Sequence, residues 1–172
     1  STNPSTVNTL GKLCVKFYKK NKIATVIKHI PGHGGANSDS HFVLPKVNDT
    51  LQSLKKKDFK CFKNTFSLFA MTAHVLYTKI DKKNNATHSS IILKKIIRKE
   101  IGYNGILISD DISMKALKHN VVANAHIAIN AGCNLVLYCA GKTTELKKLL
   151  NEMPYIDKFT MKKTSEFYRF LS

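Results

Sequence analysis

Apolar residues follow two different spacings along this chain, and the two spacings alternate from one end to the other. The first stretch has an apolar residue every three or four positions, at Val7, Leu10, Cys14 and Phe17. That spacing predicts a helix that carries these residues on one face. Asn3 suits the cap of this helix and Pro4 its first residue, because the first turn leaves amide hydrogens unpaired and proline has none.

Four short apolar runs predict the strands of a sheet. They cover residues 23–27, 67–72, 105–109 and 134–138. Helical patterns lie between or after them, around Leu51 and Leu54, from Thr87 or Ser89 to Gly102, and over 121–131, 144–153 and 160–171. The run 105–109 is apolar at nearly every position, which is typical of a parallel strand covered on both faces.

Strands that alternate with helices imply right-handed β-α units. A closed (β/α)8 barrel needs about 250 residues, and this chain has 172. We therefore predict an α/β fold, a partial TIM barrel of about four parallel strands with flanking helices, as a single domain over 1–172. The alternative is an open parallel sheet with helices on both faces.

The chain is strongly basic, with 28 Lys and Arg against 11 Asp and Glu and a net charge of +17. Such a charge is found in proteins that bind nucleic acid. Here the lysines are scattered along nearly every predicted helix, and Arg98 and Arg169 are the two arginines in the sequence. Because arginine is the usual bidentate reader of phosphate and guanine, we expect a solvated basic surface and no nucleic-acid partner.

The cysteines and the apolar runs indicate a cellular compartment. The four cysteines are widely spaced and form no C-x-x-C pair, which predicts reduced cysteines and neither a disulfide framework nor a cysteine metal site. No apolar run reaches the roughly 18 to 20 residues of a membrane span. Residues 1–13 lack the features of a secretory signal. We expect a cytoplasmic protein with no membrane partner.

The residues with chemical potential follow three of the predicted strands. Lys28 and His29 end the first strand, His74 follows the second, and Asp110 and Asp111 end the third. In β/α folds the carboxyl edge of the sheet carries the active site. The sequence therefore predicts that these side chains share one site.

The long loop 31–45 adds Asp39 and His41. Residues two apart in an extended loop point the same way, so a carboxylate could hold this histidine in one tautomer for acid and base work near neutral pH. The alternative is an ordinary turn with an exposed histidine. A metal site at His29 and His33 is not expected, because a Pro-Gly pair breaks the helix that their spacing would need.

An ionised carboxylate at the end of a buried strand is costly unless it is bound or catalytic. Asp111 could instead cap a helix over 112–118, which would leave Asp110 free to face the pocket. Met114 and His74 are candidates to line the pocket and contact substrate. A packing role for this methionine and a satisfied structural role for this histidine are the alternatives.

Four segments of the chain resemble glycoside hydrolase family 3, in order and at family-like spacing. They are KHIPGHG at 28–34, DSHFVLP at 39–45, MTAHVLY at 71–77 and GILISDDISM at 105–114. The resemblance covers about residues 3–140 and is closest to the β-N-acetylglucosaminidases of bacterial peptidoglycan recycling. The segment 131–135 also fits, although the family usually has Asp where Asn134 stands.

The resemblance implies a role for each matched residue. Asp110 matches the nucleophile that forms a covalent glycosyl-enzyme, and His41 matches the acid/base residue with Asp39 as its partner. Lys28 and His29 match residues that hydrogen-bond the hydroxyls of a terminal N-acetylglucosamine. The implied reaction is retaining hydrolysis of that sugar from muropeptide substrates, without a cofactor.

The chain also departs from the family pattern. Members of this type are about twice as long, and their first half carries an Asp-x-Glu-Gly-Gly motif and an arginine with no counterpart here. Gly35 and Ala36 stand where the family often has Asp-Thr. We therefore expect the C-terminal half of a catalytic domain, truncated at its N-terminal side. It would be active alone, or be a remnant that needs self-association or a separate N-terminal half.

Overall fold

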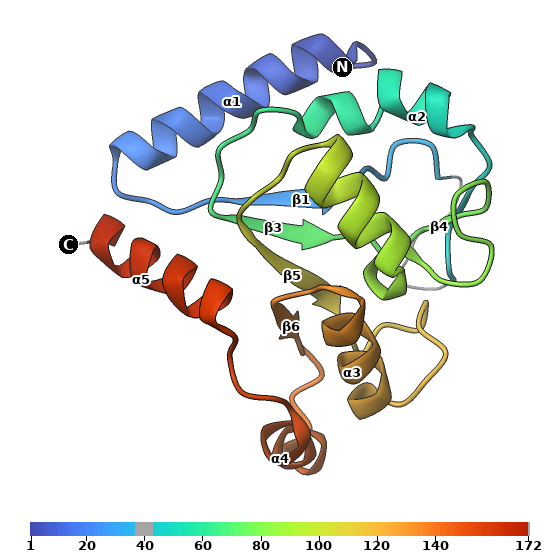
Figure 1. Cartoon of the computed structure of the whole chain (residues 1–172), viewed down its shortest axis with the longest axis vertical. Helices are drawn as coiled ribbons and strands as arrows, with labels where there is room; N and C mark the ends of the chain where they lie inside the picture. The colour runs from blue at the N-terminus through green and yellow to red at the C-terminus, as the bar shows by residue number, and fades with distance from the viewer. Residues whose placement is uncertain (37–42, 172) are drawn as a thin grey trace.

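The computed structural model describes residues 1–36 and 43–171. Its main sheet has four parallel strands in the order β1-β3-β5-β6, as Figure 1 shows. These strands are β1 (Val26–Ile30), β3 (Phe69–Thr72), β5 (Ile106–Asp111) and β6 (Leu135–Leu137). Each strand lies beside the strands that precede and follow it along the chain in this sheet. The predicted parallel direction is confirmed.

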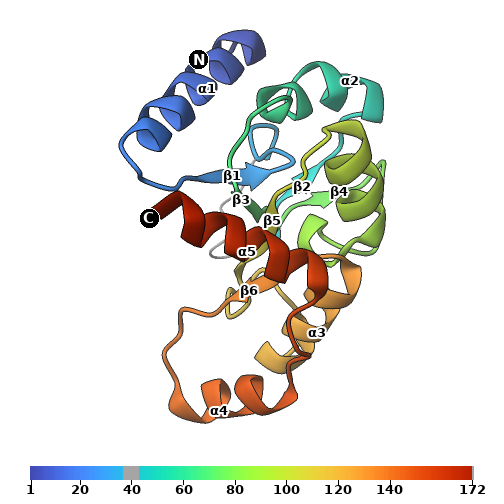
Figure 2. The same cartoon turned by 60° about the vertical axis from the view of Figure 1, so that its left-hand side comes forward.

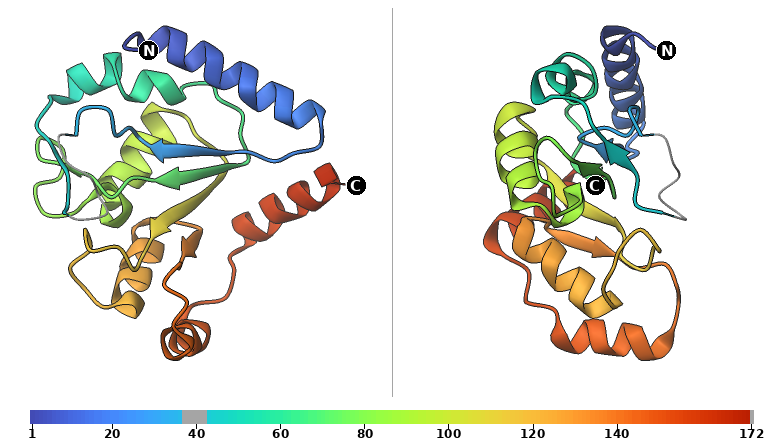
Figure 3. Two further views of the ribbon diagram at one scale, coloured as in Figure 1. Left: turned by 180° about the vertical axis from the view of Figure 1, so that it is seen from behind. Right: turned by 90° about the vertical axis from the view of Figure 1, so that its right-hand side faces the viewer.

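Helices occupy each connection of the main sheet. The elements are α1 (Pro4–Lys20), α2 (Leu51–Lys56), the 3₁₀ turn η1 (Phe59–Phe62), the short η2 (Ala86–His88), the π-helix η3 (Ile91–Glu100), α3 (Val121–Ala131), α4 (Thr143–Glu152) and α5 (Lys158–Leu171). Seen from the carboxyl ends of the strands, α2, η3 and α3 lie along one side of the sheet (Figure 3, right). A doubly wound sheet would reverse its strand order and carry helices on both faces. The arrangement is therefore that of consecutive β-α units from a barrel.

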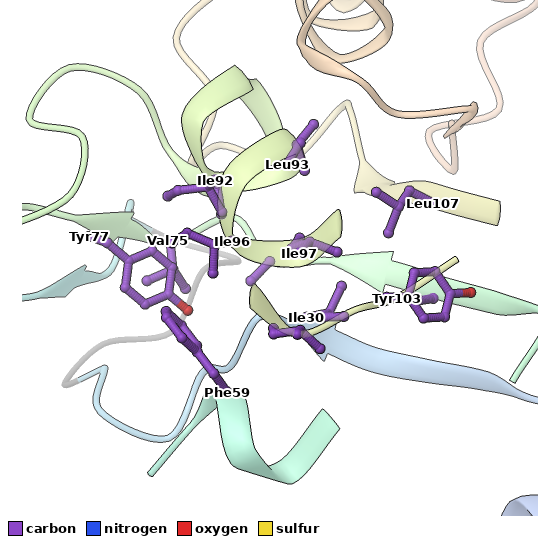
Figure 4. Close-up of a cluster of buried hydrophobic side chains, with 14 of the residues drawn as sticks. Ile30, Phe59, Val75, Tyr77, Ile92, Leu93, Ile96, Ile97, Tyr103 and Leu107 are labelled. Carbon is purple, nitrogen blue, oxygen red and sulfur yellow. The ribbon is translucent and has the colours of Figure 1, made fainter. Parts of the chain in front are cut away.

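The core fills the space between the strands and these helices. Figure 4 shows Ile30 and Leu107 from the sheet facing Ile92 and Ile97 of η3, all completely buried. Burial alternates along β1 and β3, and in β3 the fully buried positions are Ala70 and Thr72. In β1, Val26 is 43% exposed. One face of the sheet is therefore buried against the helices in the core, while the other face is only partly covered.

Two small structures lie beside this core. Strands β2 (Lys46–Val47) and β4 (Leu76–Tyr77) pair in parallel between the loops that follow β1 and β3. Helix α5 passes the amino ends of the strands (Figure 2), where Phe167 packs edge-on against Phe69 at 5.2 Å between ring centroids.

The structure differs from the sequence prediction at three elements. Residues 112–118 form turns and not the helix considered for them. The first strand begins at Val26 and not at Ile23. Helix α1 carries its apolar stripe outward, with Phe17 66% exposed, because α1 is held by its other face. There the Asn8 amide donates to the carbonyls of Cys61 and Lys63.

Among the described residues, no helix combines the length and the apolar character that crossing a membrane requires.

Candidate active site

The carboxyl ends of β1 and β5 bring His29 and Asp110 together across the end of β3. The Nε2 atom of His29 lies 3.6 Å from Oδ2 of Asp110, and their side chains are 31% and 15% exposed. The predicted convergence at this edge of the sheet is confirmed for these two residues. An oxygen of Asp110 is thus held near a ring nitrogen in a partly desolvated position.

His29 is poised to be neutral near neutral pH. Burial lowers the pKa of His29 below its ordinary value, and the charge of Asp110 opposes that shift only in part. Neighbouring Lys28, His33 and His74 lower the pKa further. A neutral imidazole carries one N–H donor and one acceptor nitrogen, so His29 can hydrogen-bond a sugar hydroxyl in either sense.

A β-bulge shapes the strand that carries Asp110. Ile108 pairs with Leu135 and Asp111 with Leu137, so β5 has one residue more than β6 between these two pairs. The buried Ser109 hydroxyl oxygen accepts the Leu137 amide at 3.0 Å and so takes the place of a ladder carbonyl. Bulges re-aim side chains next to functional sites, and this one lies directly before the carboxylate pair.

The two adjacent carboxylates have different tasks. Oδ1 of Asp111 accepts the amides of Ser113 at 3.0 Å and Cys139 at 3.1 Å, and Oδ2 accepts the Ser113 hydroxyl at 2.7 Å. Asp111 therefore caps the turn after β5 and ties it to the loop after β6. Asp110 is left to face His29, as the sequence predicted, although no helix follows.

Asp110 makes one contact with the main chain. Its Oδ1 accepts the amide of Asp111 at 2.9 Å. The second oxygen, Oδ2, faces His29. One oxygen is thereby held by the backbone and the other lies beside the His29 ring.

His74 follows the end of β3 and is completely buried. Its Nδ1 is 2.8 Å from the Thr87 hydroxyl, and its Nε2 is 3.0 Å from the carbonyl oxygen of Asp111. Because protein groups engage both ring nitrogens, the expectation that His74 contacts substrate is wrong for this geometry. The alternative, a satisfied structural histidine, fits it.

The structure places the remaining candidates as follows. Lys28 is exposed on β1, in register with Met71 of β3. Met114 is half-buried in the turn after β5, and its amide donates to the Asp111 carbonyl at 3.2 Å. Asp39 and His41 lie outside the described residues.

Sequence reasoning missed the residues that hold the glycine-rich loop from beneath. The buried Tyr77 hydroxyl donates to the Gly32 carbonyl, and a side chain at Gly32 would collide with Asp58. Gly32 has a φ of +148°, a conformation that L residues rarely adopt. Nothing in the local sequence links these three positions, since Tyr77 is 45 residues from its partner.

The site edge is distinct from a cavity at the opposite end of the strands. A cavity of about 490 Å³ lies at the amino ends of the strands, between residues of α1 and α5, and contains neither His29 nor Asp110. Within 1–36 and 43–171, no three His, Cys, Asp or Glu side chains form a group that could hold a metal ion.

This geometry agrees with what comparison finds. The family model described as "Glycosyl hydrolase family 3 N terminal domain" matches residues 1–165. The chain belongs to glycosyl hydrolase family 3. The family 3 match includes every candidate site residue, with Asp39 and His41 among them.

Individual family 3 relatives are longer than this chain. A "Beta-hexosaminidase" from Neisseria meningitidis serogroup C (strain 053442) is 36% identical over 142 residues, which make up 80% of this chain and 39% of that protein. The solved family 3 beta-N-acetylglucosaminidase from Paenibacillus sp. str. FPU-7 aligns with a TM-score of 0.80 at 27% identity, over 94% of this chain and 33% of its own.

NagZ from Neisseria gonorrhoeae, solved in complex with N-trifluoroacetyl-D-glucosamine, aligns with a TM-score of 0.73 at 29% identity. That alignment covers 89% of this chain and 43% of NagZ. The family 3 chain described here therefore spans less than half the length of each of these three proteins.

Proposed function

We propose that this family 3 chain carries the nucleophile and the acid/base group of a retaining β-N-acetylhexosaminidase. The observation that carries the proposal is the position of Asp110, with one oxygen on the backbone and the other open toward His29. A carboxylate fixed in this way can attack the anomeric carbon of a sugar bound at the carboxyl edge of the sheet.

The reaction proceeds by two displacements. The Asp110 carboxylate forms a bond to the anomeric carbon while the glycosidic bond breaks, and His41 donates its proton to the departing oxygen. Asp39 holds His41 in the required tautomer. In the second step His41 takes a proton from water, the water oxygen bonds to the anomeric carbon, and the carboxylate leaves with net retention of configuration.

Lys28 and His29 bind the sugar that undergoes attack. The exposed ammonium of Lys28 and the half-buried, neutral ring of His29 lie at the carboxyl end of β1, where His29 faces Asp110. They would hydrogen-bond ring hydroxyls and so fix the anomeric carbon opposite Asp110. A cofactor has no part in this scheme.

The proposed substrate is a terminal β-linked N-acetylglucosamine on a peptidoglycan fragment. The names of the relatives support the sugar: "Beta-hexosaminidase" for the Neisseria protein and "beta-N-acetylglucosaminidase" for the Paenibacillus structure. The similarity to NagZ supports the choice of peptidoglycan fragments as the source.

Release of p-nitrophenol from its β-N-acetylglucosaminide tests the proposal. Wild-type chain should turn over, and Asp110→Ala should reduce kcat at least about a thousandfold, since removal of a nucleophile leaves only background catalysis. Asp111→Ala is a poor control because it loosens the turn, so Lys142→Ala, an exposed surface change, serves as the matched control. Equal background rates for wild type and Asp110→Ala would reject an active isolated chain.

The second candidate function is that of one part of a two-part enzyme. The half-exposed Val26 on the partly covered face of the sheet favours it. Mixing this chain with the first half of that relative should then raise turnover above that of either alone. Light scattering on the isolated chain would separate self-association from a need for a different partner.

A further inference from the structure

We infer that His74 is a positioning residue for Asp110, acting through a one-way hydrogen-bond chain that runs from Thr72 through Thr87 and His74 to the carbonyl of Asp111. The inference deepens the proposed function, and it depends on that function only for naming Asp110 as the nucleophile. The hydrogen bonds themselves are a property of the fold.

The direction of the chain follows from what each group can donate. The Asp111 carbonyl can only accept, so Nε2 of His74 must carry its proton. A neutral imidazole then has no proton on Nδ1, so this nitrogen needs a donor, and the Thr87 hydroxyl lies 2.8 Å from it. The Ala73 carbonyl is a second acceptor for the same hydroxyl at 3.1 Å, and the shorter distance assigns the hydrogen to Nδ1. With the single Thr87 hydrogen assigned to Nδ1, the Thr72 hydroxyl, 2.8 Å from the Thr87 oxygen, is the donor of that pair.

The neutral state of His74 has a physical cause. Burial lowers the pKa of His74, while the Asp111 carbonyl and the charges of Asp110 and Asp111 oppose the shift only in part. The side chain is completely buried, so an added charge would have no water to solvate it. Burial and hydrogen-bond geometry therefore select the same form, neutral with the proton on Nε2.

His74 replaces a missing part of the sheet. The ladder between β3 and β5 ends at the pair of Met71 and Ile108, before the carboxylates are reached. On the other side of β5 the bulge interrupts the pairing with β6 between Ile108 and Asp111. The imidazole extends from the end of β3 to Asp111 and supplies a side-chain link where the backbone link has stopped.

A hydrogen bond couples the main-chain orientation of Asp111 directly to the Asp110 carboxylate. The Asp111 amide donates to Oδ1 of Asp110, so the main chain at Asp111 determines which carboxylate oxygen is occupied. The Met114 amide is a second donor to the same Asp111 carbonyl, at 3.2 Å. Loss of the imidazole would leave the Met114 amide as the donor to this carbonyl, and that amide belongs to the same turn and moves with it.

The first experiment determines the protonation state of the His74 ring and does not require enzymatic activity. Long-range ¹H–¹⁵N spectra of ¹⁵N-histidine-labelled chain should show one ring, absent in His74→Gln, as the neutral Nε2–H form from pH 6 to 8. Thr87→Val should alter that ring's nitrogen shifts, because Nδ1 loses its donor. A ring protonated on Nδ1, or one that titrates near the ordinary histidine pKa of ~6.5, would overturn the inference.

The second experiment measures the carboxyl ¹³C signal of Asp110. In ¹³C-aspartate-labelled chain the chemical shift of the Asp110 carboxyl carbon, assigned by its loss in Asp110→Asn, should change in His74→Leu at constant pH. His74→Gln should preserve the wild-type chemical shift, since a glutamine amide can donate to the Asp111 carbonyl. His88→Leu is the matched control, because His88 is a half-buried neighbouring histidine whose Nε2 has no hydrogen-bond partner.

Circular-dichroism melts separate positioning from folding. If His74→Leu lowers Tm but leaves the Asp110 carboxyl signal as in wild type, His74 is merely structural and the inference is wrong. Where the wild type is active, His74→Leu should reduce kcat by ~10- to 100-fold with little change in KM, as expected for a misplaced reacting group. His74→Gln should recover most of the loss. An inactive wild type would count against the proposed function, while both spectroscopic results would still decide this inference.

Discussion

At the scale of single residues, the site depends on two adjacent aspartates that have different hydrogen-bond partners. Asp110 and Asp111 are identical in type and adjacent in sequence, yet two main-chain amides and a hydroxyl occupy Asp111 while Asp110 faces His29. The sequence indicated this division, because one carboxylate was needed at the start of the next turn. The partners of His74 could not be predicted, since Thr87 meets it only after the chain has folded around the end of β3.

The histidines predict how stability depends on pH. Burial lowers the pKa of His88 to about 4, and it also lowers those of His29 and His74. Below pH ~6.5 the unfolded chain takes up protons that the folded chain refuses, so the free energy of unfolding should fall as the pH decreases toward 4. Above pH ~7 these histidines are neutral in both the folded and the unfolded chain, so they no longer make the free energy of unfolding depend on pH.

Urea denaturation between pH 4 and 8 measures this effect. His88→Gln should show a shallower decrease below pH 6.5 than the wild type, because one of the three groups no longer titrates. An exposed residue without a titratable side chain provides the control, and Gln52→Ala should leave the slope unchanged. Equal slopes for His88→Gln and wild type would contradict the assignment.

At the scale of elements, hydrophobic spacing predicted where strands and helices lie, but not which face each one buries. Helix α1 shows this most clearly, since its apolar stripe is exposed and its Asn8 face is held by η1. A stripe at helical spacing states only that an apolar face exists. The elements packed against the helix decide whether that face is covered, and within the described residues nothing covers it.

Two glycines give a matched test of element packing. Gly105 precedes β5, and an added Cβ would overlap the Leu68 carbonyl and the Tyr103 hydroxyl. Gly11 lies within α1, and an added Cβ would meet nothing within 4 Å. Gly105→Ala should destabilise the fold by about 1–3 kcal/mol, whereas Gly11→Ala should stabilise it by roughly 0.5–1 kcal/mol. Chemical denaturation of both variants measures the difference, and destabilisation by Gly11→Ala would show that α1 has a neighbour in solution.

At the scale of the whole molecule, the excess of 28 basic over 11 acidic residues opposes compaction. Like charges repel across the molecule, and the screening length falls from about 30 Å at 0.01 M salt to about 8 Å at 0.15 M. Sodium chloride over this range should therefore raise Tm, by roughly the 2–4 °C that corresponds to 1 kcal/mol in a chain of this size.

Differential scanning calorimetry in sodium chloride checks this prediction. A Tm that falls with salt would mean that ion pairs such as those of Glu100 with Lys55 and Lys63 outweigh the repulsion. The nucleic-acid alternative has its own signature, a binding constant that falls steeply as salt rises. We expect no binding to DNA or RNA even at low ionic strength, and saturable binding there would revive that alternative.

The sequence alone determined the alternation of strands and helices, the parallel sheet and the strand ends at which the chemistry gathers. Those features depend on residue type and spacing, which the linear order of the chain contains. Only the tertiary structure decided that His74 turns away from solvent to support Asp111, that Tyr77 and Asp58 hold Gly32, and that α1 leaves its apolar face open. Each of these depends on contacts between residues far apart in the sequence, and such contacts exist only once the strands lie side by side.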